Sequence, residues 1–217
     1  MPARSRAGCN LLPRLVCAEY ANSELVVVAR LIRVEHIVPA HQQDGHIYTL
    51  KTERTLRGKI GDTFDVYEEN SSGRASFYWI KGEKYLLFLN SDGHGSWWLY
   101  GCGNSAPLKE AGFALRAIEA MKARRGGLIH GLVHSNYSTD SVEGIYVQIR
   151  GENRDYTAIT DENGEFRLHV PAGTYDVHPN HKGWSFSRSI DGFEDPSALK
   201  IEDGGCAQIV LETVEDR

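Results

Sequence analysis

The stretch Tyr156–Val177 constrains this chain most, because apolar and polar residues alternate along it between two turn signals. Phe166, Leu168 and Val170 alternate with charged or polar residues, which is the period of a strand with one buried face and one solvated face. Gly164 closes an Asp-Glu-Asn-Gly turn, where it can take the positive φ that a Cβ atom disfavours. We therefore predict a hairpin of two strands joined at Gly164, with a further strand after the next turn.

Turn and strand motifs on both sides of this hairpin belong to the same pattern. They are Gly131-x-Val133, Glu143-Gly144-x-x-Val147-x-Ile149-x-Gly151, Thr160-Asp161-x-x-Gly164-x-Phe166 and Pro171-x-Gly173-x-Tyr175-x-Val177. Together they resemble the carboxypeptidase regulatory-like domain, a small transthyretin-like β-sandwich, over about residues 127–213. The resemblance implies a seven-stranded sandwich that usually serves as a non-catalytic module attached to another domain.

The composition is that of a globular chain with room for two domains. Its 217 residues are 41% hydrophobic and 24% charged, which argues against wholesale disorder. The pattern changes at Gly126-Gly127, so we predict domains over residues 9–125 and 127–213. A net charge of -5 and a pI near 6.0 give little electrostatic support for a nucleic-acid partner. No apolar run approaches the length of a membrane span.

The residues before Gly126 read as short strands with a helix at each end. The segments 24–38, 47–56, 64–68, 83–89 and 97–102 predict five or six antiparallel strands. The first is long enough to bend around a barrel, and its run Leu25–Ala29 is apolar enough to be buried on both faces. One helix is expected over Pro13–Ala21. A second is expected to begin at a cap on Asn104 or Ser105 and to stop at Gly126.

A closed five-stranded, OB-like barrel with flanking helices is similar to the netrin-like fold, the fold of the inhibitory domain of tissue inhibitors of metalloproteinases. The likeness is carried by Cys9 and Cys17, Val26-x-Val28-Ala29-x-Leu31, Tyr48-x-Leu50 with Arg57-Gly58, Trp79-x-x-Gly82-Glu83-x-Tyr85-Leu86, and Cys102 followed by Pro107-Leu108. Inhibitors of this family chelate the protease zinc through the free amine and carbonyl of an amino-terminal cysteine. Cys9 has eight residues before it here, so the resemblance implies inhibition only if processing exposes that residue.

Four cysteines, Cys9, Cys17, Cys102 and Cys206, are spread over the chain without a Cys-x-x-Cys motif. Their separation argues against a zinc knuckle or a dithiol redox motif. With the netrin-like resemblance in view, we predict a disulfide between Cys9 and Cys102, with Cys17 as the rival partner, and a buried thiol at Cys206. A disulfide requires an oxidising compartment, whereas the chain as given shows no export signal.

Catalytic and metal-binding motifs are absent from the sequence. There is no Gly-x-Ser-x-Gly elbow, no phosphate-cradling glycine loop and no His-Glu-x-x-His. His130 and His134 would lie about 13 Å apart on a strand, too far to share one ion, and His178 and His181 are expected in an exposed turn. We therefore predict no enzymatic activity, no metal and no cofactor. The alternative is a transthyretin-like hydrolase acting on a small molecule, although the Tyr-Arg-Gly-Ser ending of that family is missing here.

Aromatic residues are the remaining candidates for a functional site. Trp79 and the segment with Trp97, Trp98 and Tyr100 lie near glycine-rich turns, where exposed aromatic side chains would suit a docking partner. Neighbouring residues on a strand point to opposite faces, so Trp97 and Trp98 are both buried only if both faces of the strand are covered.

We therefore predict a non-enzymatic binding protein of the extracellular space or the cell envelope, with protease inhibition as the sharpest version of this role. The expected partner is a protein or a cell-surface component. The binding site is expected on the barrel, near the segments Cys9–Pro13 and Asp92–Ser96.

Overall fold

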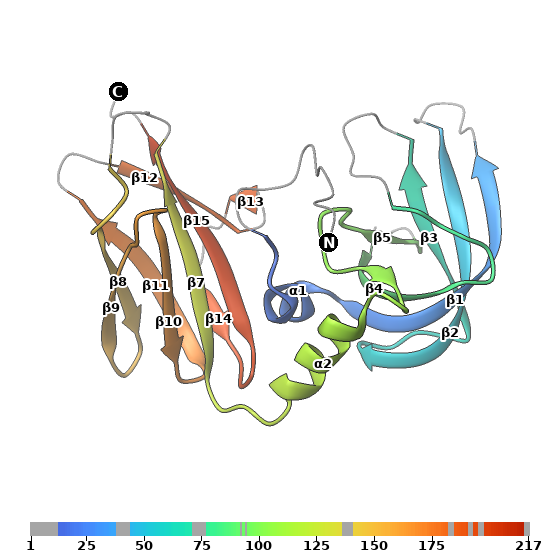
Figure 1. The fold of residues 1–217 in the computed structure, drawn as a ribbon, viewed down its shortest axis with the longest axis horizontal. Coiled ribbons are helices and arrows are strands. Elements are labelled where there is room, and N and C mark those ends of the chain that lie inside the picture. The colour runs from blue at the N-terminus through green and yellow to red at the C-terminus, as the bar shows by residue number, and fades with distance from the viewer. Residues whose placement is uncertain are drawn as a thin grey trace. The chain divides into compact units, whose positions relative to one another are not determined.

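The computed structural model describes residues 13–37, 44–70, 77–91, 93, 95–135, 141–181, 185–190, 193–194 and 198–214 (Figure 1). The chain splits into two compact units, Met1–Ile118 and Glu119–Arg217. Both units are built mainly from β-strands, as predicted. The helix α2 (Gly112–Met121) crosses the division between the units.

The first unit contains the predicted closed barrel of five strands. They are β1 (Leu25–Ile37), β2 (Gly45–Arg57), β3 (Thr63–Glu69), β4 (Lys84–Ser91) and β5 (Trp97–Leu99), and the short β6 (Ala106–Pro107) pairs with β4. The order β1-β2-β3-β5-β4 closes into a ring because β1 also pairs with β4. The pairing of β3 with β5 is parallel, so the prediction that all these strands are antiparallel was wrong at this point, because side-chain alternation does not record strand direction. The other pairings are antiparallel. Closure of this kind gives each of the five strands a partner on both sides over part of its length.

Strand β1 makes this closure possible because it pairs with strands on both sides. Leu25–Arg30 pairs with β4, and Val26–Ile37 pairs with β2. Three register shifts interrupt the β1–β2 ladder, and bulges of this kind bend a strand. All five residues of Leu25–Ala29 are buried, so both faces of this stretch are covered, as its unbroken apolar run predicted.

One hydrophobic cluster fills the barrel. Its buried members are Leu25, Val27, Ala29, Leu31, Tyr48, Leu50, Phe64, Val66, Tyr85, Leu87 and Leu89. They occupy alternate positions of four strands, because successive side chains of a strand point to opposite faces. Burying a large apolar side chain stabilises the fold by about 1.5–3 kcal/mol, so this alternation is the main source of barrel stability.

Helix α1 (Val16–Asn22) begins three residues after the predicted start and is tied to the barrel by polar contacts. Its Glu19 is buried, and Glu19 Oε2 accepts hydrogen bonds from Asn104 N at 2.5 Å and Asn104 Nδ2 at 2.6 Å. Tyr20 donates its hydroxyl hydrogen to the Leu56 carbonyl at 2.8 Å. These hydrogen bonds hold the helix against β2 and against the segment that follows β5.

Helix α2 is shorter than predicted at both ends, and the prediction of its cap was wrong. Asn104 bonds to Glu19 instead, and Ser105 Oγ accepts a hydrogen bond from Phe88 N at 2.9 Å. At the other end the Met121 carbonyl accepts a hydrogen bond from Arg124 N at 3.1 Å, so the chain turns before it reaches Gly126. Both candidate capping side chains thus hydrogen-bond to residues far away in the sequence, and neither caps the helix.

The second unit is a β-sandwich of two sheets. One sheet has the order β10 (Glu165–Val170), β7 (Gly127–His134), β15 (Cys206–Val214), β12 (Ser185–Ile190) and β13 (Phe193–Glu194). The other has the order β14 (Leu199–Ile201), β11 (Gly173–Asn180), β8 (Tyr146–Gly151) and β9 (Asp155–Ile159). Among these described strands, seven have five residues or more, which is the predicted number, while β13 and β14 are short additions.

The stretch Tyr156–Val177 forms the predicted strands but not the predicted hairpin. β9 pairs with β8 and β10 pairs with β7, so the turn at Gly164 carries the chain from one sheet to the other. Asp161 Oδ1 accepts hydrogen bonds from Asn163 N and Glu165 N, each at 2.9 Å, and Gly164 has a φ of 79°. The alternation of side chains is the same for a hairpin and for a crossover, so the pattern could not distinguish them.

Candidate functional site

Trp79, one of the aromatic residues predicted to bind a partner, is anchored in the barrel. Its Nε1 donates a hydrogen bond to Glu68 Oε2 at 2.9 Å, and its ring stacks on Tyr48 with centroids 4.6 Å apart. Glu68 is 7% exposed, so this bond satisfies a buried carboxylate. The indole therefore packs against the barrel core.

Trp97, Trp98 and Tyr100 are all partly buried. Trp97 packs against the barrel core, and Trp98 points to the opposite face of β5 because the two residues are neighbours on a strand. The guanidinium of Arg14 lies 4.0 Å from the centroid of the Tyr100 ring. The partner-binding role of these aromatic residues stays a prediction. The parts of the expected site that lie outside the described residues are 9–12, 92 and 94.

Aromatic rings form a ladder from the barrel interior to the far end of β1 and β2. Trp79 lies 5.0 Å from Tyr85 and 4.6 Å from Tyr48, measured between ring centroids. Tyr48 is followed by His46 at 5.9 Å, and His46 by His36 at 5.0 Å. The ladder therefore connects fully buried Tyr85 with histidines near the solvent.

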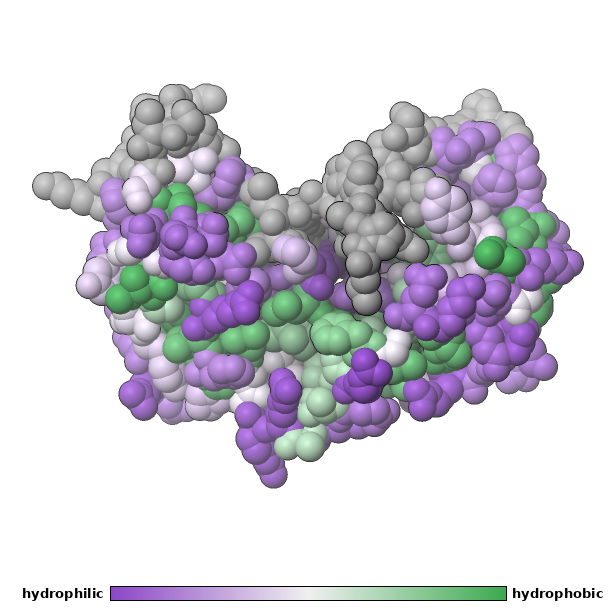
Figure 2. Space-filling view, viewed as in Figure 1, coloured by the Kyte–Doolittle hydropathy of each residue, from purple (hydrophilic) through white to green (hydrophobic). Residues whose placement is uncertain are grey.

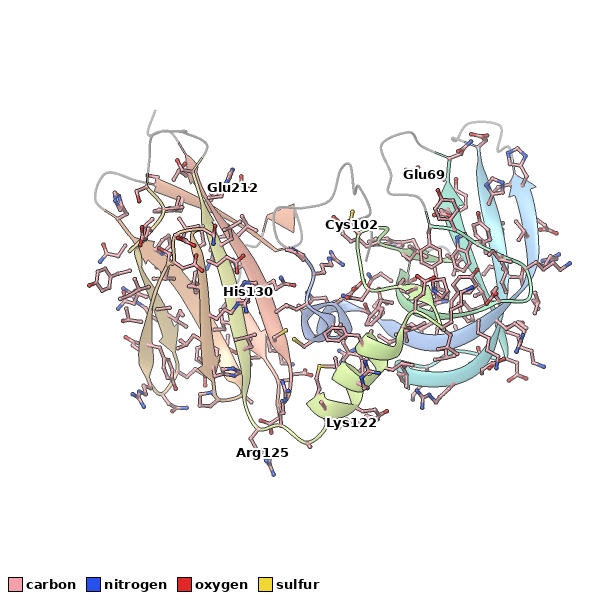
Figure 3. The ribbon with its side chains drawn as sticks, viewed as in Figure 1. Glu69, Cys102, Lys122, Arg125, His130 and Glu212 are labelled. Carbon is pink, nitrogen blue, oxygen red and sulfur yellow. The ribbon has the colours of Figure 1, made fainter. Side chains whose placement is uncertain are left out.

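The outer end of this ladder carries a carboxylate beside two imidazoles. His36 and His46 are directly opposite in the β1–β2 register. Asp44 Oδ2 lies 3.4 Å from His36 Nε2 and accepts a hydrogen bond from Asn70 Nδ2 at 3.3 Å. The bond from Asn70, followed by that from His36, holds the pKa of the Asp44 carboxyl below its usual value. Glu69, labelled in Figure 3, marks the end of β3 on this side of the barrel.

Four exposed apolar residues gather on two neighbouring segments of the barrel unit, and we call them the apolar edge. They are Ile32 (37% exposed), Val34 (42%), Tyr78 (76%) and Ile80 (55%). The two segments lie side by side because Leu31 N donates to the Glu83 carbonyl at 3.0 Å and Gly82 N donates to the Leu31 carbonyl at 2.8 Å. Hydrophobic residues are visible at the surface of this unit among hydrophilic ones (Figure 2).

The apolar edge was not predicted from the sequence, because its aromatic residues were treated as one group. Phe77 and Trp79 pack against the core, so the residues that alternate with them, Tyr78 and Ile80, point away from it. Tyr85 then fixes this segment. Its hydroxyl oxygen accepts a hydrogen bond from Ile80 N at 2.6 Å and its hydrogen is directed to the Tyr78 carbonyl at 3.3 Å. The alternation of residues along Phe77–Ile80 was the sequence signal that could have revealed the exposed pair.

A depression of about 510 Å³ adjoins the apolar edge and shares Ile80 with it. Its lining residues are Arg30, Ile80, Lys81, Gly82, Glu83, Lys84, Leu108 and Lys109, of which four are basic and one is acidic. Glu53 partly neutralises it through Arg30 Nη2 at 3.1 Å and through Lys84. Glu83 lies 3.6 Å from Lys109 Nζ. The depression therefore carries positive charge on a chain whose net charge is -5.

The histidines singled out in the sequence form no metal cluster. Within the part of the chain that the structure describes, no three His, Cys, Asp or Glu side chains are grouped to hold an ion. His130, labelled in Figure 3, is 2% exposed, and its Nε2 lies 3.1 Å from Glu165 Oε2. His178 is exposed as predicted, but it lies in strand β11 and not in a turn, 2.6 Å from Asp176 Oδ2.

Disulfides are present, and they correct one cysteine prediction. Cys17, Cys102 and Cys206 are all disulfide-bonded, so the prediction of a free thiol at Cys206 was wrong, although this residue is buried. Sequence spacing cannot reveal such a bond, because it depends on which cysteines the fold brings within bonding distance. The predicted Cys9–Cys102 bridge includes a residue outside the described part of the chain and stays a prediction.

The described helices are short. None of them is both long and apolar enough to cross a membrane.

Comparison with protein families gives a match over part of the second unit. Residues 125–194 match the family described as BOS complex subunit NOMO1-like, second beta sandwich domain. This match covers less than half of the chain and agrees with the β-sandwich fold of the second unit. A search of curated proteins gives no match.

Solved structures give three distant likenesses. The Bacillus anthracis TIE protein is 8% identical with a TM-score of 0.32, covering 88% of this chain and 35% of that one. GBS52, the minor pilin of Streptococcus agalactiae, is 12% identical with a TM-score of 0.30, covering 90% and 87%. The major pilin protein T3.2 of Streptococcus pyogenes is 12% identical with a TM-score of 0.25, covering 82% and 70%. This chain thus spans about a third of the TIE protein, and TM-scores this low carry no functional argument.

Proposed function

We propose that this chain is a non-catalytic binding protein of the extracellular space or the cell envelope, and that its barrel unit binds a protein partner through the apolar edge. The observation that carries the proposal is the gathering of Ile32, Val34, Tyr78 and Ile80 on two adjoining segments. Single exposed apolar residues are normal on protein surfaces, whereas apolar residues that gather with polar residues around them mark interaction sites.

Tyr78 is the expected anchor of this interaction. It is the most exposed of the large apolar side chains described, and tyrosine is among the residue types that dominate binding energy at interfaces. Its segment is already held in place by the buried hydroxyl of Tyr85. Little ordering is then needed on binding, and less conformational entropy is lost.

The basic depression supports a partner that presents acidic groups beside an apolar side chain. Lys81 lines it and has no ion-pair partner among the described residues, while Arg30 and Lys84 share one carboxylate, that of Glu53. Complementary charge at the rim of an interface speeds association and favours the correct partner.

The location and the domain identities belong to the same proposal. Disulfides persist in oxidising compartments, which supports an extracellular or envelope location. The β-sandwich match over residues 125–194 supports a recognition module of the carboxypeptidase regulatory-like kind in the second domain. Netrin-like character of the first domain, and an inhibitor role through Cys9, remain expectations from the resemblance alone.

The test compares two apolar pairs of similar exposure on the intact, disulfide-bonded chain. Photo-crosslinking on the surface of the source cells should capture a partner, and Tyr78→Ser with Ile80→Ser should reduce capture about tenfold or more. The matched control is Tyr146→Ser with Ile159→Ser, a pair that is 57% and 56% exposed on the second unit. An equal loss in both double variants, or unchanged capture in the first, would refute the apolar edge as the binding site.

A further inference from the structure

We propose that His36 and His46 together bind a divalent late transition-metal ion, with Cu²⁺ held more tightly than Zn²⁺ or Ni²⁺. The site lies at the end of the β1–β2 ribbon and is separate from the basic depression. Neutral imidazole is a preferred ligand of Cu, Ni and Zn, whereas Mg²⁺ and Ca²⁺ prefer oxygen ligands. The ligand chemistry therefore selects the class of ion.

Strand register places the two imidazoles on one face. His36 pairs directly with His46 across the antiparallel β1–β2 ladder. Residues directly opposite in such a ladder have Cβ atoms about 4.5–5.5 Å apart and extend from the same face of the sheet. The backbone thus fixes both side chains at chelating range before any ion is bound.

The separation of the rings fits a shared ion. Two imidazoles bound at about 2.0–2.1 Å to one metal would have ring centroids roughly 4.5 Å apart at a right-angled coordination and roughly 5.2 Å apart at a tetrahedral one. The His36 and His46 centroids are 5.0 Å apart, with ring planes 48° from each other. The pair is therefore within the range that simultaneous coordination requires.

The surroundings of the pair favour a cation and hold the rings in place. Asp44 Oδ2 lies 3.4 Å from His36 Nε2, and a carboxylate that contacts a ligating histidine both orients the ring and makes it a better donor. The ring of Tyr48 stacks on His46 from the other side, with centroids 5.9 Å apart. The side chain of His36 is 52% exposed, so an ion can reach the pair from solvent.

Two protein nitrogens define the expected behaviour of the site. Structural zinc sites use four protein ligands and catalytic ones use three, and the described residues offer no such larger group. Water would complete the coordination of an ion bound by His36 and His46. The site is therefore expected to exchange its ion with solvent and to give it up to a chelator.

Titration calorimetry of the untagged full chain with CuCl₂, ZnCl₂ and NiCl₂ tests the proposal. We expect one ion per chain, with affinity falling about tenfold or more in His36→Gln and in His46→Gln and about tenfold in Asp44→Asn. His169→Gln, which removes an exposed histidine from β10, is the matched control and should bind as the wild type does. Electron paramagnetic resonance of the Cu²⁺ form should show coupling to two imidazole nitrogens.

The proposal is overturned if His36→Gln and His46→Gln bind with wild-type affinity, or if the spectrum shows a single imidazole. Equal weakening in His169→Gln would also overturn it, because binding would then be spread over surface histidines. His46 belongs to the aromatic ladder, so its variant is first checked by circular dichroism. Should it fail to fold, His36→Gln decides the matter, because His36 stands at the exposed end of the ladder.

Discussion

The two units fill their cores with different kinds of side chain. The barrel core includes Tyr48, Phe64 and Tyr85, with Phe77, Trp79 and Trp97 packed against it. The sandwich core is mostly aliphatic; its buried aromatic residues are Phe166 and Tyr175, and Tyr156 and Phe186 pack against it. The barrel therefore relies on large aromatic rings, four of which, those of Tyr48, Tyr85, Trp79 and Trp97, also carry a polar atom.

This difference explains why apolar residues are exposed in different ways on the two units. In the barrel, the polar atoms of Trp79 and Tyr85 bind Glu68 and the backbone at Ile80, and so hold a segment outside the strands against the core. In the sandwich, exposed Tyr146 and Ile159 face each other across β8 and β9 as a cross-strand pair. Rings with hydrogen-bonding atoms can fix an irregular segment at a surface, whereas aliphatic packing stabilises regular strands.

The largest expected effects come from removing one core ring from each unit. Tyr85→Ala should lower the free energy of unfolding of the barrel by about 3–5 kcal/mol, and Phe166→Ala that of the sandwich by a similar amount, because each leaves a cavity. Hydrogen exchange measured peptide by peptide separates the two units, which need not unfold together. If both variants lose protection throughout the chain, the two units unfold as one cooperative unit and the predicted difference between them is wrong.

Cleavage and reduction test the division between the units. Trypsin is expected to cut at exposed Arg124 or Arg125 and to leave two folded pieces. Cys206 is bonded and is the only cysteine after Cys102, so the pieces should separate on a gel only after reduction. In the chain-entropy model, a disulfide that closes a loop as long as that between Cys9 and Cys102 stabilises the folded chain by on the order of 4 kcal/mol.

Peptide mapping under non-reducing conditions shows which cysteines are bonded to each other. The predicted Cys9–Cys102 bridge would leave Cys17 to pair with Cys206, because both of these are disulfide-bonded. If trypsin leaves the chain intact between Lys122 and Gly126, the predicted domain division is wrong. If a disulfide-linked Cys17–Cys102 peptide is found, the predicted Cys9–Cys102 bridge is wrong.

A smaller effect should separate the roles of two tyrosine hydroxyls. Tyr85→Phe should cost about 1–3 kcal/mol, because Ile80 N would lose its hydrogen-bond acceptor in a partly buried place. Tyr175→Phe removes only a donor to the Pro171 carbonyl, 2.9 Å away, and should cost about 1 kcal/mol. Urea unfolding gives both values. Equal costs would mean that the barrel hydroxyl has no special part in fixing the segment with Tyr78.

The smallest expected difference is in the response of the two units to acid. Burial lowers the pKa of His130 below its usual value, although the hydrogen bond with Glu165 opposes this. The unfolded chain then binds the proton more tightly, so the sandwich should lose stability as the pH falls below about 6.5. The pKa of Asp44 is also lowered, and its contribution to the barrel should be lost only below about pH 4.

Thermal unfolding of the wild type and His130→Gln between pH 8 and pH 4 measures this difference. The melting temperature of the variant should change less with pH than that of the wild type above pH 5, because the imidazole that binds a proton on unfolding has been removed. An identical pH dependence in both proteins would assign the acid response of the sandwich to other groups.

For the candidate site, the sequence indicated the barrel and its aromatic residues but not the exposed members. Trp79 was predicted as one of the aromatic residues near glycine-rich turns; its Nε1 donates a hydrogen bond to Glu68 and its ring stacks on Tyr48. Exposure of Tyr78 depends on which of two alternating residues meets the core. That choice is made by the fold and not by the residue types.

The sequence by itself determined the strands and which side of each would be buried, because alternation records one face per strand: on the predicted face, Phe166 and Val170 are buried and Leu168 is partly buried. Only the tertiary structure decided that the turn at Gly164 joins two sheets, that Asn104 binds Glu19 instead of capping α2, and that Cys206 is bonded. Periodicity is a local property of the chain. Sheet partners, capping and disulfide bonds depend on groups far apart in sequence, and their outcome is set by which groups the packed cores bring together.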